Sequence, residues 1–285
     1  MPHPDALPVT GPPVTLCGSL SRLASPLGRS LHEAGYRALG LAFTYVPFVV
    51  SDLGGAITGM RALGIRGFGV SQPYKQAVMP LLDALDPQAR RIGAVNTVVN
   101  DGGHLVGHNT DWLGAVRALE EVTPLQGARV LLVGAGGAAR AIAFGLQGKG
   151  ARTTITNRDR ARAESLAAEV GAEVARFEPA EMLRGARDHE IIVNATSVGQ
   201  AGRAAGAPAE SPVPEEALGE GQLVMDIVYK PLQTPLGAAA RRRGARVIQG
   251  DRMLLHQAAV QFELYTGRPA PRAAMDEALQ RALGT

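Results

Sequence analysis

The chain has almost no cysteine, the residue that stabilises small secreted proteins and forms many zinc sites. It has 285 residues but a single cysteine, Cys17, which lies in an apolar stretch. One thiol excludes an intramolecular disulfide framework and a cysteine-based zinc site, and a buried thiol of this kind is usually inert. We therefore expect no metal site and a reducing, cytoplasmic location.

Long apolar runs and concentrated charge are also missing. No stretch approaches the roughly 20 apolar residues needed to cross a membrane. The Pro-rich start, residues 1–13, lacks the apolar core of a secretory signal and is interpreted as a leader. The net charge is +3, and the one basic run, Arg241–Arg243, falls late in a helical stretch, where cations favour the helix dipole. We expect neither a membrane nor a nucleic acid as a partner.

Short apolar strands alternate with helical segments in two series. Hydrophobic residues make up 46% of the chain but aromatic residues only 4%, so the cores must be mainly aliphatic. In the first series, strands are predicted at 14–20, 38–45 and 67–71, with a hairpin at 95–107. In the second, they are predicted at 130–133, 153–156, 191–194, 223–228 and 246–248. This alternation predicts two α/β units with parallel strands.

The sequence also predicts one long loop and a C-terminal helix. Residues 199–214 are rich in Ala, Gly and Pro, which predicts a mobile surface loop. Helical spacing over about Met253–Tyr265 predicts the last helix, which should end at Gly267 because glycine favours the position after a helix.

A glycine-rich segment opens the second series. The buried-strand pattern Val130–Val133 leads directly into Gly134-Ala135-Gly136-Gly137-Ala138-Ala139 and then into a helical segment. This matches G-x-G-x-x-G/A, in which glycines allow the tight turn and the close approach of a pyrophosphate to the free N–H groups of the helix. In this strand–turn–helix context the motif predicts a dinucleotide site, although a tight turn without a ligand has the same local pattern.

The end of the next strand indicates which dinucleotide binds. NAD enzymes usually place Asp or Glu here, but this chain has Asn157 and Arg158, with Arg162 one helical turn later. Guanidinium groups pair well with a phosphate, so we expect NADP. Asp159 leaves an alternative open, because it can bind a ribose hydroxyl or serve the helix N-terminus. Both arginines can also be plain surface residues.

Polar residues in the first series and in the predicted C-terminal helix need an explanation. They are Ser71-Gln72-Pro73-Tyr74-Lys75, Asn96-Thr97, Asn109-Thr110-Asp111 and Gln257. With them, the sequence resembles the shikimate dehydrogenase family over essentially the whole chain after residue 13. The matching segments, in order, are Ser25-Pro26, Pro73-Tyr74-Lys75, Ala94-Val95-Asn96-Thr97, Asn109-Thr110-Asp111, Gly134-Ala135-Gly136-Gly137-Ala138, Asn157-Arg158, Asn194-Ala195-Thr196-Ser197 and Gln257-Ala258.

The resemblance implies a fold and a reaction. The fold is α/β, with an N-terminal α/β substrate domain, a Rossmann-type doubly wound nucleotide domain, and C-terminal helices that return to the first domain. We place the split substrate domain at 1–112 and 252–285 and the NADP domain at 113–251. The implied reaction is the reversible NADPH-dependent reduction of 3-dehydroshikimate to shikimate, a step of the shikimate pathway toward chorismate and aromatic amino acids.

By the same resemblance, Lys75 and Asp111 form the catalytic pair. Carbinol oxidation requires a base or proton relay at the hydroxyl, and ketone reduction requires a donor there. Without the resemblance, Lys75 also fits a surface lysine and Asp111 a helix N-cap. The implied substrate contacts are Ser25, Ser71, Asn96, Asp111, Tyr229 and Gln257. The implied cofactor contacts are Gly134, Ala135, Gly136, Gly137, Ala138, Asn157, Arg158, Arg162, Thr196, Ser197, Ile227 and Gly250.

The chain departs from the family pattern on the substrate side. Leu23 replaces the first of two serines before Pro26, Gly69 replaces an asparagine, and Ser71 replaces a threonine. Each lost neutral hydrogen bond is worth about 0.5–1.5 kcal/mol. These changes resemble a subgroup called shikimate dehydrogenase-like proteins. Arg22, beside the lost serine, is our hypothesis for a replacement carboxylate anchor.

Three functions therefore stay open from the sequence. The first is a dehydrogenase for shikimate, the second is one for a related polyhydroxylated ring acid such as quinate or an aminoshikimate, and the third is a non-catalytic NADPH-binding homologue. Retention of both Lys75 and Asp111 argues against the third, because a binding module needs neither. We expect a monomer or a homodimer.

Overall fold

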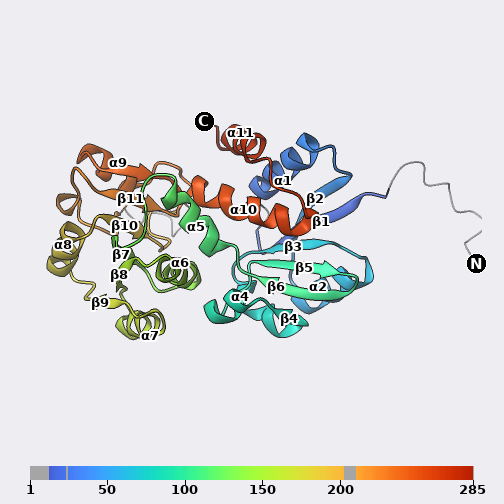
Figure 1. The fold of residues 1–285 in the computed structure, drawn as a ribbon, viewed down its shortest axis with the longest axis horizontal. Helices are drawn as coiled ribbons and strands as arrows, with labels where there is room; N and C mark the ends of the chain where they lie inside the picture. The colour runs from blue at the N-terminus through green and yellow to red at the C-terminus, as the bar shows by residue number, and fades with distance from the viewer. Residues whose placement is uncertain (1–12, 24, 202–209, 285) are drawn as a thin grey trace, which may run out of the picture.

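Two α/β units lie side by side along the long axis of the molecule, and two helices run between them (Figure 1). The structure is a computed structural model that describes residues 13–23, 25–201 and 210–284. The helices between the units are α5 (Asp111–Glu120) and α10 (Gly250–Thr266). Most of the predicted leader at 1–13, and residues 202–209 of the predicted loop at 199–214, lie outside the described residues.

The first unit contains a mixed six-stranded sheet in the order β2-β1-β3-β5-β6-β4. Strand β1 is parallel to β2 and β3, whereas β5 is antiparallel to β3 and β6. The predicted hairpin is confirmed, because Gly102 and Gly103 both have a positive φ in the turn between β5 and β6. The strands are β1 (Thr15–Ser21), β2 (Phe43–Val49), β3 (Gly67–Val70), β4 (Ala84–Leu85), β5 (Thr97–Asp101) and β6 (His104–His108).

One predicted boundary in this unit is wrong. Helix α1 runs to Ala38, and Gly40, with φ of 60°, turns the chain so that β2 begins only at Phe43. Helix α2 is capped by Asp52, whose carboxylate accepts from the Gly55 N–H. The helices here are α1 (Pro26–Ala38), α2 (Leu53–Ala62), α3 (Tyr74–Ala77) and α4 (Pro87–Ile92).

The second unit contains an entirely parallel sheet in the order β12-β11-β10-β7-β8-β9. This is the doubly wound order of Rossmann-type domains, so the predicted fold class is confirmed. The strands are β7 (Arg129–Val133), β8 (Arg152–Thr156), β9 (Glu173–Ala175), β10 (Ile191–Asn194), β11 (Leu223–Asp226) and β12 (Arg246–Ile248). The helices are α6 (Gly137–Gly148), α7 (Arg160–Val170), α8 (Pro179–Asp188) and α9 (Pro235–Arg242).

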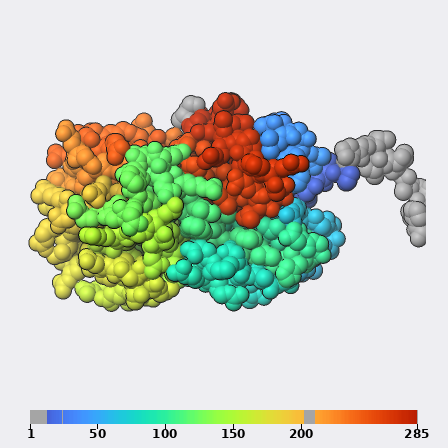
Figure 2. Space-filling view, in the orientation of Figure 1, coloured from blue at the N-terminus to red at the C-terminus, as the bar shows by residue number. Residues whose placement is uncertain are grey.

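The C-terminal helices return to the first unit, as expected from the family resemblance. Helix α10 ends at Gly267, with φ of 66°, but it is not the last helix, because α11 (Arg272–Leu283) follows. Phe262 of α10 and Met275 of α11 share a core with Leu31 of α1 and with Cys17, whose thiol pKa burial raises to about 12. Figure 2 shows the red C-terminal surface lying against the blue and cyan N-terminal surface.

Helix α10 also packs closely on α5. The two helices that connect the units therefore lie against each other. A Cβ on Gly114 of α5 would lie 2.8 Å from the Met253 carbonyl oxygen, so only glycine allows this approach. Across the ranges that the structure describes, none of the helices is long and apolar enough to cross a membrane.

Candidate functional site

A cavity of about 910 Å³ opens at the carboxyl ends of the parallel strands in the second unit. It lies where the strand order reverses between β7 and β10, the usual ligand position in doubly wound sheets. Most of the predicted cofactor residues line it, namely Gly134, Ala135, Gly136, Gly137, Ala138, Asn157, Arg158, Arg162, Thr196, Ser197 and Ile227.

The glycine loop forms one wall of this cavity and offers an open cradle for phosphate. Gly134 has φ of 119°, and a Cβ there would lie 3.1 Å from the Ala195 carbonyl oxygen. Gly136, by contrast, faces open space and caps α6 without any side-chain hydrogen bond, so the first N–H groups of the helix remain free. Backbone donors at a helix N-terminus in open space fit a pyrophosphate.

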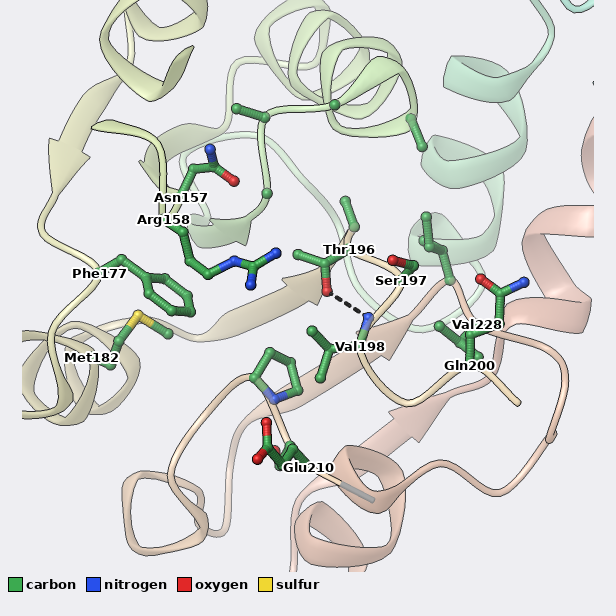
Figure 3. Close-up of a pocket in the computed structure, with 18 of the residues that line it drawn as sticks. Asn157, Arg158, Phe177, Met182, Thr196, Ser197, Val198, Gln200, Glu210 and Val228 are labelled. Carbon is green, nitrogen blue, oxygen red and sulfur yellow. Dashed lines mark hydrogen bonds between the residues drawn. The ribbon is translucent and has the colours of Figure 1, made fainter. Parts of the chain in front are cut away.

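Arg158 points into the cavity at the far side of this loop. In Figure 3 its guanidinium extends toward Thr196, with Phe177 and Met182 beside it. The side chain of Asp159 is occupied elsewhere, because it caps α7 by accepting from the Arg162 N–H and pairs with the Arg162 guanidinium at 3.1 Å. The cap interpretation of Asp159 is therefore confirmed. Arg158 has no hydrogen-bond or ion-pair partner among the described residues, and Asp159 is occupied, which fits a 2′-phosphate better than a bare ribose hydroxyl.

The segment after β10 is held in place by Asn194. Its side-chain oxygen accepts from the Thr196 N–H and hydroxyl, and its NH₂ group donates to Asp226 at 2.9 Å. Burial raises the pKa of the Asp226 carboxyl. Thr196 in turn accepts from the Val198 N–H at 3.1 Å, the dashed contact in Figure 3. The Asn-Ala-Thr-Ser motif therefore fixes the floor of the cavity.

A second cavity of about 230 Å³ adjoins the first, between β1, β3, α5 and α10. Three residues, Ala138, Ile227 and Tyr229, line both cavities, so the two spaces share a wall at the glycine loop. A Cβ on Gly250 would lie 2.5 Å from the Ile227 carbonyl oxygen, which explains why a glycine begins α10 there. The remaining predicted residues line this cavity, namely Ser25, Ser71, Lys75, Asn96, Asp111, Tyr229, Gly250 and Gln257.

Lys75 and Asp111 meet in the smaller cavity. The Lys75 Nζ lies 2.6 Å from Asp111 Oδ2, and the side chains are only 16% and 9% exposed. Lys75 is therefore not a surface lysine. Asp111 is also not the cap of α5, because Thr110 holds that position and Asp111 is the first helical residue. A mostly buried ion pair that opens onto a cavity can bind and transfer a proton there.

Asn96 connects the elements around this pair. Its NH₂ group donates to Asp111 Oδ1 at 2.8 Å and to Gln257 Oε1 at 3.2 Å, and its oxygen accepts from the Thr110 N–H at 2.7 Å. The first unit, α5 and α10 are thus held in one hydrogen-bond network. Burial raises the pKa of Tyr229, an effect that Lys75 opposes and Asp111 reinforces, so its phenol remains a donor.

Sequence reasoning missed three polar residues of the smaller cavity, Ser19, Tyr45 and Gln261. Gln261 lies one helical turn after Gln257, and that spacing was the available signal. Phe177 and Met182 of the larger cavity were also missed, because α8 was not predicted. Arg22 is exposed and is not among the cavity residues, so the structure gives the anchor hypothesis no support.

Comparisons with known proteins agree with this geometry. Residues 20–98 match the family model "Shikimate dehydrogenase substrate binding domain", residues 117–227 match "Shikimate / quinate 5-dehydrogenase", and residues 252–280 match "Shikimate 5'-dehydrogenase C-terminal domain". The NADP(+)-dependent shikimate dehydrogenase of Moorella thermoacetica is 43% identical over 281 residues, which is 94% of each chain.

Solved structures are similar over nearly the full length. The shikimate 5-dehydrogenase of Thermus thermophilus, in complex with NADP(H) and shikimate, has a TM-score of 0.85 and 36% identity, and the match covers 95% of this chain and 100% of that one. A 5-ketofructose reductase of a Gluconobacter species has a TM-score of 0.83 and 35% identity over 95% and 99% of the chains. The chain therefore belongs to the shikimate dehydrogenase family of NADP-dependent oxidoreductases.

Proposed function

We propose that this chain interconverts 3-dehydroshikimate and shikimate with NADP as the cofactor. The observation that carries the proposal is the Lys75–Asp111 pair, which lies in a cavity that shares a wall with the nucleotide cavity. A ring ketone in the smaller cavity and a nicotinamide at the shared wall would be neighbours. The relatives with this name bind or use the same cofactor.

In the reduction, NADPH would supply the hydride. We propose that the Lys75 ammonium donates a proton to the ketone oxygen and stabilises the charge that develops on it. Asp111 holds Lys75 in position at 2.6 Å, and its other oxygen is held by Asn96. In the oxidation, the same Lys75 nitrogen would accept the hydroxyl proton. A buried pair suits both directions because it excludes competing water.

The proposed positioning roles follow from which cavity each residue lines. Ser25, Ser71, Asn96, Tyr229 and Gln257 can each donate and accept hydrogen bonds, as a polyhydroxylated ring requires. Arg158 would bind the 2′-phosphate and the free N–H groups of α6 the pyrophosphate. Thr196, Ser197, Ile227 and Gly250 would line the path toward the nicotinamide.

Other parts of the proposal concern organisation. We propose that the division into 1–112 with 252–285, and 113–251, describes the substrate and NADP domains. The protein would act in the cytoplasm as a monomer or homodimer, without nucleic acid. Quinate or an aminoshikimate is the alternative substrate, because Leu23, Gly69 and Ser71 depart from the family pattern.

A kinetic comparison tests the proposal. Purified protein is assayed for reduction of NADP and NAD with shikimate and with quinate, and NADPH affinity is measured by fluorescence titration. Highest kcat/KM with shikimate and NADP is expected. A higher kcat/KM with quinate would overturn the substrate, and a higher one with NAD would overturn the cofactor. Tight NADPH binding without any turnover would support the non-catalytic alternative.

A further inference from the structure

The end of the smaller cavity that lies toward β1, β2 and β3 has a distinct composition. We call it the far wall and define it by Ser19, Tyr45, Gly69 and Gln261. Tyr45 is 3% exposed, and its hydroxyl shares a hydrogen bond with Ser19. A Cβ on Gly69 would lie 3.1 Å from that hydroxyl and 3.4 Å from the Gln261 side chain. The bare glycine therefore leaves the Tyr45 hydroxyl facing the cavity, whereas the Gln261 amide nitrogen already donates to the Asn96 carbonyl oxygen at 3.2 Å and to Thr97 Oγ1 at 2.9 Å.

The far wall carries no formal charge. Of the described residues that line the cavity, only Lys75 and Asp111 are charged, and they neutralise each other at 2.6 Å. Behind Tyr45, the His32 ring stacks on the phenol with centroids 4.4 Å apart. Burial lowers the pKa of His32 to about 4, so the imidazole is neutral near pH 7. Desolvation also raises the pKa of Tyr45, which keeps its hydroxyl protonated.

Neutral hydroxyl and amide groups recognise neutral partners well. Hydroxyl groups and side-chain amides both donate and accept hydrogen bonds. They can therefore bind a substrate hydroxyl whether that hydroxyl donates or accepts. A carboxylate only accepts, and a buried carboxylate without a cation is held less well than a paired one. The far wall is therefore matched to substrate hydroxyls at least as well as to an acid.

We infer that this cavity also takes uncharged polyhydroxylated ketones and reduces them to the corresponding secondary alcohols at the Lys75–Asp111 pair. The inference rests on the proposed function for the hydride step. NADPH gives a hydride to the carbonyl carbon and becomes NADP⁺, while the carbonyl π electrons move to oxygen. That oxygen takes a proton from Lys75, which regains one from water. Tyr45 is the specificity-determining residue of the far wall.

Two matched probes test the inference in the oxidative direction. One is shikimate, and the other is its analogue with hydroxymethyl in place of the carboxylate. The kcat/KM of the neutral analogue should lie within about tenfold of the value for shikimate, because the replacement changes only hydrogen bonds to neutral groups. A loss above about 100-fold, as expected if a charge-assisted pair were removed, would overturn the inference and leave the proposed function intact.

The remaining outcomes separate the two proposals. Turnover of the analogue without turnover of shikimate would support the inference and overturn the ring acid as substrate. Turnover of neither, with NADPH still bound, would overturn both. Binding of the analogue to the complex with NADP⁺, measured by calorimetry, provides a readout that does not depend on the hydride step.

Tyr45→Phe tests the residue itself. This change should lower kcat/KM for the neutral analogue about three- to tenfold, the scale of one neutral hydrogen bond, and weaken its binding equally. Tyr265→Phe is the matched control, because Tyr265 lies in the same core, is not among the cavity residues, and its hydroxyl has no hydrogen-bond partner in the part of the chain that the structure describes. Equal kinetics for the two variants would overturn the role of Tyr45.

Discussion

The two cavities of this molecule are built by different means. The nucleotide cavity uses mainly backbone, with the glycine loop, the free N–H groups of α6 and the ends of neighbouring parallel strands. The substrate cavity uses side chains from distant segments, of which Asn96, Asp111 and Gln257 are hydrogen-bonded together. A backbone site tolerates sequence change as long as the local conformation persists. In a side-chain site, a substitution adds or removes a contact with the ligand. Gly69 and Ser71, two of the departures from the family pattern, line this cavity.

The first prediction removes the side chain on which the substrate cavity depends most. Lys75→Ala should lower kcat by about 10²–10⁴-fold, the usual contribution of a positioned acid–base group. NADPH affinity should be unchanged, because the glycine loop and Arg158 remain. Stopped-flow kinetics and fluorescence titration measure the two quantities.

The control for that change is Lys149→Ala. Lys149 is 40% exposed and pairs with Glu120 on the surface, so its loss should leave the kinetics unaltered. A Lys75→Ala variant with near-normal kcat would show that proton transfer does not pass through this lysine.

The second prediction tests Arg158, whose guanidinium points into the nucleotide cavity. Arg158→Ala should weaken NADPH binding about 10- to 100-fold while leaving NADH binding within about twofold, because hydrogen bonds to charged groups are worth about 1.5–3 kcal/mol. Arg160→Ala is the control, since Arg160 is exposed and pairs with Glu164. Parallel losses for both cofactors would indicate that Arg158 contacts something other than the 2′-phosphate.

The third prediction concerns the buried histidine behind the substrate cavity. Below pH 6.5 the unfolded chain takes up a proton on His32 that the folded chain excludes until about pH 4, so stability falls as the pH falls through that window. Between pH 7 and pH 5 this loss is about 2 kcal/mol.

His32→Phe keeps the ring contact with Tyr45 and should remove this part of the pH dependence in urea unfolding. His104→Gln, a change at an exposed histidine, should keep the pH dependence of the parent. A parent and a His32→Phe variant with equal slopes between pH 5 and pH 7 would contradict the assignment.

The smallest effect is expected at Asp159. Asp159→Asn retains a capping side chain and should change unfolding free energy by less than about 1 kcal/mol. The ratio of NADPH to NADH affinity should stay within about threefold, because the carboxylate is engaged by α7 and Arg162. A shift of tenfold or more toward NADPH would mean that Asp159 does face the ribose.

The two cavities also differ in how much of each could be predicted from the sequence. The strand, the glycines and the start of α6 are contiguous, so periodicity and glycine spacing predicted them directly. The Lys75–Asp111 pair was predicted from the family resemblance. The local sequence alone does not distinguish Lys75 from a surface lysine or Asp111 from a helix cap. Tyr45 was not predicted at all, because a tyrosine on an edge strand is common in any sheet.

The sequence by itself determined the α/β class, the NADP loop and the family, because short-range backbone preferences and ordered motifs carry that information. Only the tertiary structure decided that Asp159 is a helix cap, that Arg22 lies outside the cavity, and that Tyr45 and Gln261 face Gly69. The last of these facts depends on the packing of Gln261 of α10 beside Gly69 of β3. Contacts between segments more than 150 residues apart, such as Gln261 with Asn96, leave no local pattern in the chain.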